Sequence, residues 1–183
     1  IPVYPHHPYQ IPLSYKEKMG KAKGMVNRYV RAMKYVDQRV GELVKKLSAL
    51  DQGRTLFVIV GDHGEGFGEH PGSFMHGSTL FQEMAKSFVL WHVPQLNLKG
   101  ALRERPSGHV DLAPTLLDVL ELEIPSAYAG HSLRRAGSER MIPLFTGYGQ
   151  PLRGFVDGRW KYIWNERSGY SQLYDLERDP GER

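Results

Sequence analysis

Apolar residues recur at helical spacing through the first third of the chain. Between positions 15 and 50 they follow one another at steps of three, four and seven, which predicts one long amphipathic helix over residues 15–50. Gly53 stands where a glycine C-cap would end that helix. Residues 1–13 contain four prolines and predict an extended loop in front of it.

Three later runs have the pattern of β-strands. Residues 55–60, TLFVIV, form a continuous β-branched and aromatic run. Such a run predicts a strand buried on both faces in the middle of a sheet, with the helix 15–50 packed on one side. Residues 88–93 and 141–145 predict a second and a third strand.

Two shorter signals complete the pattern. Residues 111–120 predict a short helix with Asp111 as its N-cap and Pro114 in its first turn. Residues 154–164 predict a hairpin that turns at Asp-Gly, positions 157–158. The order of helix, strands, helix and hairpin predicts an α/β sandwich with an antiparallel edge.

The composition indicates a folded chain and argues against some classes of binding partner. The 183 residues are 40% hydrophobic and 24% charged, values typical of one globular domain rather than a disordered chain. The net charge of +4 is too small to indicate nucleic-acid binding. The basic residues of 15–50 lie mostly off the apolar stripe and indicate a solvated face, so an anion-binding surface is the weakest hypothesis.

The absence of cysteine excludes a disulfide framework, a thiolate metal site and a cysteine nucleophile within this chain. No apolar run approaches the roughly 20 residues that span a bilayer. The first residues, IPVYPHHPYQIP, have no initiator methionine and no basic-then-apolar leader. We expect the chain to begin inside a larger protein.

The segment GDHGEGFGEHPGSFMHG, residues 61–77, directly follows the strand predicted at 55–60. Ligand sites of open α/β sheets form at the carboxyl ends of strands. Asp62 and His63 offer one hard oxygen and one imidazole nitrogen, a mixed set that suits Zn²⁺ or Mn²⁺. Neighbouring residues can both reach one ion only where the chain curls, which Gly61 and Gly64 allow. A simple Asp-His-Gly turn without metal remains the alternative.

The other polar residues of this segment point less clearly to a site. Glu65, Glu69 and His70 are interpreted as loop residues that cap backbone amides. His76, followed by glycine, is better placed for a ligand than for a core, although spacing alone leaves it undecided.

Several motifs together resemble one known family. TLFVIVGDHGEGFGEH followed by HGSTLFQEMAKSFVLW resembles the sulfatase-like group of the alkaline phosphatase superfamily. Three further segments agree in the family's order: H-x-P-Y at residues 6–9, HVDLAPTLLD at 109–118, and DGRWKYI at 157–163 with QLYDLERDPGE at 172–182. The resemblance covers nearly the whole chain.

The resemblance implies a fold and a domain organisation. The fold is a three-layer α/β/α sandwich of the alkaline phosphatase/sulfatase type, incomplete, with a C-terminal antiparallel hairpin. Residues 1–183 then form the C-terminal part of one sulfatase-like domain. Its expected parts are a substrate-side loop at 1–13, the helix at 15–50, the core at 55–145, and the terminal hairpin and tail at 150–183.

The resemblance also implies roles for individual residues. Asp62 and His63 match the family's paired ligands for a divalent metal ion, which is Zn, Mn, Ca or Mg. His76 and His6 match residues that contact the transferred sulfate or phosphate group, with His7 the weaker alternative to His6. His109 matches a position that looks structural.

The sequence departs from the family pattern at two points, and both affect which reaction can be expected. The chain contains neither the family's earlier acidic metal ligands nor its nucleophile, so we expect both in a missing N-terminal half and expect the chain alone to be inactive. Calcium sulfatases usually have Asp-Asn where this chain has Asp-His, a pair shared with phosphodiester hydrolases and phosphoethanolamine transferases.

The expected function is therefore that of a metal-dependent hydrolase or transferase acting on sulfate or phosphate esters. The enzyme class is a sulfuric ester hydrolase or a phosphoryl-transfer or phosphodiester hydrolase. The expected substrate is a small-molecule, lipid or glycan ester, and no nucleic acid. The resemblance favours an extracytoplasmic, periplasmic or membrane-associated location. The alternative is a non-catalytic binding or assembly module that keeps the sulfatase fold.

Overall fold

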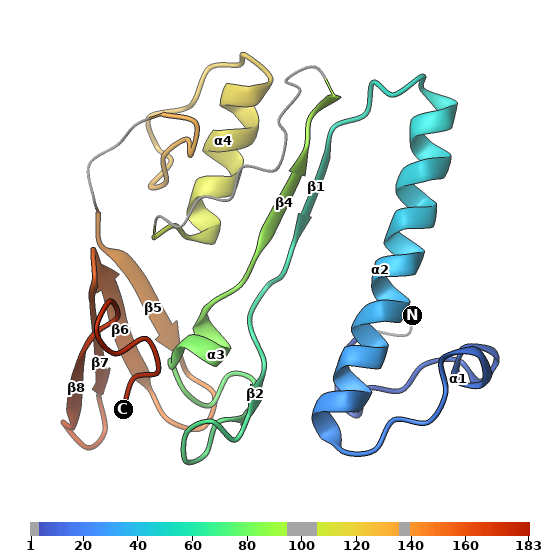
Figure 1. Cartoon of the computed structure of the whole chain (residues 1–183). Coiled ribbons are helices and arrows are strands. Elements are labelled where there is room, and N and C mark those ends of the chain that lie inside the picture. The colour runs from blue at the N-terminus through green and yellow to red at the C-terminus, as the bar shows by residue number, and fades with distance from the viewer. Residues whose placement is uncertain (1–3, 95–105, 136–139) are drawn as a thin grey trace. The chain divides into compact units, whose positions relative to one another are not determined.

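A computed structural model describes residues 4–94, 106–135 and 140–183 (Figure 1). The chain divides into two compact units. The first comprises Ile1–His76 and Lys86–Ala101, and the second comprises Gly77–Ala85 and Leu102–Arg183. Parts of the loop predicted at 1–13 and of the core predicted at 55–145 lie outside the described residues. Within the described residues no helix has the length and apolarity that crossing a membrane requires.

The elements of the first unit are α1 (Leu13–Met19), α2 (Met25–Leu50), β1 (Phe57–Val60), β2 (Gly66–Phe67), β3 (Phe74–Met75) and β4 (Val89–His92). Those of the second unit are α3 (Gln82–Ala85), the 3₁₀ turn η2 (His109–Asp111), α4 (Leu112–Val119), β5 (Ile142–Thr146), β6 (Leu152–Asp157), β7 (Trp160–Asn165) and β8 (Ser171–Asp175). The strands predicted near 55–60, 88–93 and 141–145 are all present.

The single helix predicted over 15–50 is two helices. Gly20 ends α1 with φ 77° and Gly24 precedes α2 with φ 80°. Both angles lie in the left-handed region, which interrupts a right-handed helix and which glycine adopts without steric cost. The predicted C-terminus of the long helix is confirmed, because α2 ends at Leu50 and the N–H of Gly53 donates to the Ser48 carbonyl (2.8 Å).

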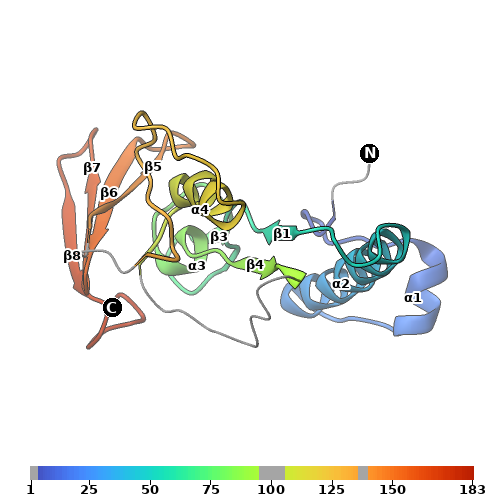
Figure 2. The ribbon, with the colours of Figure 1, turned by 90° about the horizontal axis from the view of Figure 1, so that it is seen from above.

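An aromatic cluster holds the N-terminal segment against the helices. Tyr9, Ile11 and Ala32 are buried, with 1%, 3% and 0% of their surface exposed. The partly buried side chains packed around them are Tyr15, Met19, Met25, Tyr29, Tyr35 and Phe67. Both views show α1 beside the first turns of α2 (Figures 1 and 2). The segment before α1 is therefore fixed by packing although it has no regular secondary structure.

Strand β1 pairs antiparallel with β4, in a register that runs from Phe57 opposite His92 to Val60 opposite Val89. The prediction of a strand buried on both faces is wrong for the described residues, in which β1 pairs with β4 alone and Val60 is 43% exposed. The expected packing of the long helix on one face is also incomplete. Ala32 is its one buried residue, and Leu43 is 55% exposed. The apolar pattern marks surfaces suited to burial, but the described elements do not cover them.

The second unit contains a four-stranded antiparallel sheet in the order β5-β6-β7-β8 (Figure 2). The predicted hairpin is confirmed as β6 and β7, whose pairing closes with Asp157 opposite Trp160. Gly158 has φ 53°, the left-handed conformation that a tight two-residue hairpin turn requires. The two-residue turn is Gly158-Arg159, one position later than the Asp157-Gly158 turn that the sequence predicts, because Asp157 is still paired in β6.

Asp111 stands at the expected N-cap position of α4, but its carboxylate does not cap the helix. Its oxygens instead accept hydrogen bonds from the N–H groups of Gly108 and His131, each at 2.9 Å, and it pairs with Arg140. The predicted N-cap position is confirmed, but the buried carboxylate ties the neighbouring loops together instead of bonding the first turn of α4.

A buried ion pair ties the C-terminal tail to β7. The Lys161 ammonium lies 2.6 Å from a carboxylate oxygen of Glu182, and both side chains are almost completely buried. The Glu182 carboxylate also accepts the N–H of Gln82, at 2.5 Å. Burial lowers the pKa of Lys161, while the hydrogen bond and the charge of Glu182 oppose that shift. The sheet, the tail and α3 thus share one network.

Replacing Glu182 by Gln should destabilise the chain, because Lys161 keeps a buried charge without its counter-ion. Loss of one partner of a buried pair costs about 3–5 kcal/mol. The free energy of unfolding from urea denaturation measures the effect. Glu177→Gln is the matched control, since Glu177 is 71% exposed and lies 3.7 Å from Arg159. Equal unfolding free energies for the two variants would contradict the assigned importance of the buried pair.

Candidate active site

The segment between β1 and β3 brings together several polar side chains of the first unit. The N–H of Gly61 donates to the Phe88 carbonyl (3.1 Å), and the Ser87 hydroxyl donates to the Gly61 carbonyl (2.6 Å). These bonds fix the point where the chain leaves β1. Strands β2 and β3 then form a short hairpin with Gly66 opposite Met75. The hairpin brings the residues just before β2 and just after β3 close together.

Asp62 and His63 lie at the start of this segment, as predicted. The Nδ1 atom of His63 is 2.7 Å from the Gly64 carbonyl oxygen, so it carries the hydrogen and Nε2 keeps its lone pair. Nε2 lies 3.6 Å from an Asp62 carboxylate oxygen, and the Asp62 side chain is 90% exposed. Two ligands about 2.1 Å from one tetrahedral ion lie roughly 3.4 Å apart. The pair therefore fits two neighbouring ligands of a divalent ion.

The structure also brings together the three histidines that the sequence selected. The rings of His63 and His76 stack with centroids 4.1 Å apart. The ring of His6 meets that of His76 edge-on at 5.2 Å. The Nδ1 atom of His6 is 2.9 Å from the His7 carbonyl oxygen, which leaves Nε2 of His6 available. Residues 6, 63 and 76 thus form one cluster although up to 70 positions separate them in sequence.

The sequence interpretation missed the contacts of Glu65. Its carboxylate was interpreted as a cap for backbone amides, but one oxygen accepts the Tyr9 hydroxyl (2.5 Å) and the other lies 3.2 Å from Nδ1 of His76. Burial and then the hydrogen bond to Glu65 raise the pKa of Tyr9 well above its ordinary value, so the phenol keeps its proton as donor. By contrast, Glu69 does accept a backbone N–H, that of Phe67 (2.6 Å).

A second arrangement of metal ligands is also present. One ligand atom each from His63, Glu65 and His76 lie within 4.8 Å of one another. However, both oxygens of Glu65 already have hydrogen-bonding partners, whereas Nε2 of His63 faces Asp62. The described geometry therefore offers two candidate arrangements of metal ligands, of which the Asp62–His63 pair leaves the hydrogen bonds of Glu65 in place.

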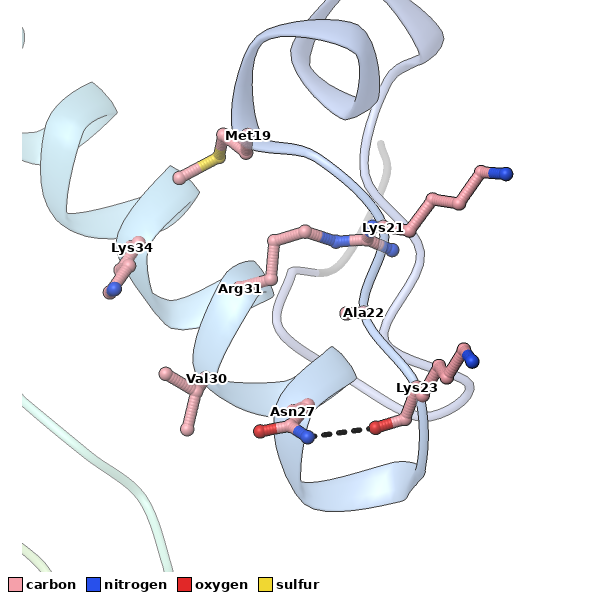
Figure 3. Close-up of a pocket in the computed structure, with 8 residues that line it drawn as sticks. All are labelled: Met19, Lys21, Ala22, Lys23, Asn27, Val30, Arg31 and Lys34. Atoms are coloured by element: carbon pink, nitrogen blue, oxygen red, sulfur yellow. Dashed lines mark hydrogen bonds between the residues drawn. The ribbon is translucent and has the colours of Figure 1, made fainter.

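A separate hollow lies at the connection between α1 and α2 (Figure 3). Its lining includes Lys21, Lys23, Arg31 and Lys34, and none of the four residues selected from the sequence. The Arg31 guanidinium donates to the Gly20 carbonyl (2.8 Å), so it supports the break between the helices. This basic surface belongs to the helix connection rather than to the histidine cluster.

Comparison with known proteins identifies the family. The sulfatase family model matches residues 1–122, about two thirds of the chain. The chain belongs to the sulfatase family.

Individual sulfatases match most of this chain but only part of their own length. An arylsulfatase from Clostridium perfringens is 27% identical over 190 residues, which cover 91% of this chain and 39% of the relative. A Δ4,5-hexuronate-2-O-sulfatase from Bacteroides thetaiotaomicron is 29% identical over 172 residues, covering 82% of this chain and 34% of the relative. The chain thus spans less than two fifths of the length of these two sulfatases.

Structural comparison supports the expected fold. A protein solved in complex with its substrate D-glucosamine-2-N,6-O-disulfate superposes with a TM-score of 0.73 at 24% identity, covering 92% of this chain and 39% of that protein. A glycosaminoglycan 2-O-sulfatase superposes with a TM-score of 0.70 at 25% identity, covering 88% of this chain and 39% of that one. The incomplete α/β fold of the alkaline phosphatase/sulfatase type is confirmed.

Gly68 should be essential to the hairpin that carries Glu65 and His76 at its two ends. Its φ is 98°, and an added Cβ would lie 2.7 Å from the Phe74 ring. Gly72 is a matched control, since its φ is 81° and its Cβ would meet no atom within 4 Å. The left-handed backbone costs either alanine variant about 1–2 kcal/mol. Gly68→Ala should cost about 0.5–1.5 kcal/mol more, because the Phe74 ring, which is 54% exposed, must turn out of its present rotamer. Denaturant titration measures the free energy of unfolding of the two variants. A Gly72→Ala loss as large as that of Gly68→Ala would contradict the proposed ring clash.

Proposed function

We propose that the chain is the C-terminal part of a metal-dependent sulfatase that hydrolyses sulfate esters. The observation that carries the proposal is the cluster in which an Asp62–His63 pair, suited to a divalent ion, lies beside His76 and His6. The relatives' names support sulfate rather than phosphate. A phosphate diester is the second candidate, because the pair is Asp-His rather than the Asp-Asn usual in calcium sulfatases.

The donor set defines which residues would hold the metal. Asp62 supplies a carboxylate oxygen, and His63 supplies Nε2, which the Gly64 carbonyl leaves unprotonated. When bound there, a divalent ion would activate a coordinated nucleophile and neutralise charge on the ester oxygens. Two protein ligands are too few for tight and selective binding, so we propose that further ligands come from outside residues 1–183.

We propose that His76 and His6 act on the transferred group rather than on the metal. Each ring has Nδ1 directed at an acceptor, the Glu65 carboxylate for His76 and the His7 carbonyl for His6. Nε2 is therefore the ring atom left to face the ester. Once Nε2 also takes up a hydrogen, the ring can donate it to an ester oxygen or to the leaving oxygen while Nδ1–H keeps its acceptor. Interactions that strengthen as negative charge develops on those oxygens would accelerate the reaction.

We propose that the missing N-terminal half packs on the uncovered apolar surface of the first unit. This surface comprises Val60, Phe88 and Leu90 near the β1–β4 pair and Val26, Val30, Leu43 and Leu47 on α2, each between 37% and 58% exposed. Exposed apolar surfaces of this kind mark interaction sites. The limited share of each relative that the chain covers supports the same arrangement.

We propose a sulfated sugar as the substrate class. One similar sulfatase is named for a hexuronate 2-O-sulfate, and one structural neighbour was solved with a disulfated glucosamine. The other candidate is a non-catalytic binding module with a sulfatase fold. It would bind a sulfated sugar without releasing sulfate.

The 183-residue chain alone should not hydrolyse esters, because it has two metal ligands and no nucleophile of the family type. The measurement is release of 4-nitrophenol from 4-nitrophenyl sulfate and from bis-4-nitrophenyl phosphate, with Zn²⁺, Mn²⁺, Ca²⁺ or Mg²⁺ added. The product of the full reading frame serves as the positive control. Metal-dependent turnover by the chain alone would contradict the proposal of a missing half.

In the product of the full reading frame, variants should separate metal binding from action on the sulfate group. Asp62→Ala and His63→Ala should lower metal content and turnover together, because each removes a direct ligand. His76→Ala and His6→Ala should keep the metal and lower kcat about 10²–10³-fold, the effect of losing one hydrogen bond to the transition state. Elemental analysis and steady-state kinetics measure both quantities.

The control for that series is His7→Ala, since the backbone carbonyl of His7 that orients His6 is retained. Its kcat should stay within about twofold of the parent value. Loss of metal from the His76 variant together with retention by the Asp62 variant would show that the proposed roles are reversed.

A further inference from the structure

We propose that Glu65, held by Tyr9, is a positioning residue that fixes one tautomer and one orientation of His76. The inference rests on the proposed role of His76 toward the transferred group, and it assigns a task to two residues that the family motifs left without one. Glu65 and Tyr9 would act through His76 and would not touch the substrate.

The contacts form a continuous chain of three side chains. The Tyr9 hydroxyl donates to one oxygen of Glu65 at 2.5 Å, and the other oxygen lies 3.2 Å from Nδ1 of His76. The Glu65 side chain is 9% exposed and that of His76 is 27% exposed. Tyr9 itself is 1% exposed and packs edge-on against Tyr29, with ring centroids 5.4 Å apart. Glu65 is thus held from the buried side and contacts His76 on the other.

The hydrogen-bonding capacity of a carboxylate explains why glutamate suits this position. A carboxylate accepts and does not donate, so both neighbours must donate to it. Tyr9 supplies one hydrogen through its hydroxyl, and the other must come from Nδ1–H of His76. In the neutral imidazole, the hydrogen on Nδ1 leaves the lone pair on Nε2. Glu65 therefore determines that Nε2 is the nitrogen of His76 that faces a ligand, as an acceptor in the neutral ring and as an N–H donor when the ring carries both hydrogens.

A metal bound by His63, Glu65 and His76 is the competing interpretation of the same cluster. It would require one oxygen of Glu65 to give up or share its present partner, the Tyr9 hydroxyl or Nδ1 of His76. The existing bonds already use both Glu65 oxygens, which favours the hydrogen-bonded chain. The two interpretations differ in whether a metal ion binds His63 and His76 together, and spectra recorded with and without added Zn²⁺ separate them.

The decisive variant is Glu65→Gln in the 183-residue chain. Glutamine can still accept the Tyr9 hydroxyl through its carbonyl oxygen, but its amide then donates toward Nδ1 of His76. The hydrogen of the imidazole should consequently move from Nδ1 to Nε2. Nitrogen-15 NMR of histidine-labelled protein, recorded about two pH units above the ordinary histidine pKa of about 6.5, distinguishes these tautomers.

The expected result is an Nδ1–H tautomer for His76 in the parent chain and an Nε2–H tautomer in Glu65→Gln. Glu69→Gln is the matched control and should leave His76 unchanged, because Glu69 bonds the backbone of Phe67. Tyr9→Phe keeps the ring but removes the donor to Glu65, and should give a mixture of tautomers. An unchanged His76 spectrum in Glu65→Gln, or the Nε2–H tautomer in the parent, would overturn the inference. Added Zn²⁺ that shifts a ring nitrogen of both His63 and His76 in the parent chain, but not in Glu65→Gln, would instead establish the competing metal site.

Kinetics of the full-reading-frame product test the consequence for the reaction. Glu65→Gln should lower kcat about 10–100-fold, as is typical for residues that orient a functional histidine, with metal content and KM near the parent values. Unfolding midpoints of each variant show whether a loss reflects folding. An unchanged kcat in Glu65→Gln beside a reduced kcat in His76→Ala would overturn the positioning role. An unchanged kcat in His76→Ala would instead refute the proposed role of His76, whatever tautomer NMR shows.

Discussion

The burial of Tyr9 is the constraint on which the candidate site depends. Its ring lies against Tyr29 and Phe67, with centroids 5.4 and 6.2 Å away, while its hydroxyl reaches Glu65. Aromatic packing supplies most of the stabilisation, since burying such a ring contributes about 1.5–3 kcal/mol. The hydrogen bond then satisfies the one polar atom that burial would otherwise leave unpaired. Because Tyr9 follows the H-x-P segment, the same packing that anchors the segment also brings His6 beside His76.

The second unit uses a buried charge in a comparable way. Asp111 and the Lys161–Glu182 pair each hold segments that are distant in sequence, and each has several hydrogen-bonding partners. A buried charge adds little stability by itself, because desolvation offsets most of the Coulomb attraction. Its stronger effect is to penalise any arrangement that leaves it unpaired. In both units the buried polar groups therefore specify where loops lie, while apolar packing supplies the favourable free energy.

The sequence predicted the elements, and it could select Asp62 and His63 as candidate metal ligands, because those features are local. A hairpin at Asp157-Gly158 and a ligand pair after a β-branched strand can each be recognised within a few residues. The role of Glu65 could not be recognised in this way, since its partners Tyr9 and His76 lie 56 and 11 positions away. The best available signal was the odd placement of a bulky tyrosine among prolines in an otherwise loop-like segment. The break at Gly20–Gly24 was missed because apolar periodicity continues across it.

The prediction of a strand covered on both faces failed for a reason that bears on function. The periodicity of apolar residues predicts which side chains should be buried, but it does not identify the surface that buries them. The β1–β4 pair and the α2 stripe have the apolar pattern of interior elements, and yet Leu43 and Leu90 are more than half exposed. Exposed apolar side chains of this size lower the solubility of a protein unless another surface covers them. The candidate site lies directly at the end of β1. If the proposed N-terminal half covers this strand, it is also in a position to supply the further metal ligands and the nucleophile that we propose for the complete site. Burial of the apolar surface and completion of the active site would then be consequences of the same association.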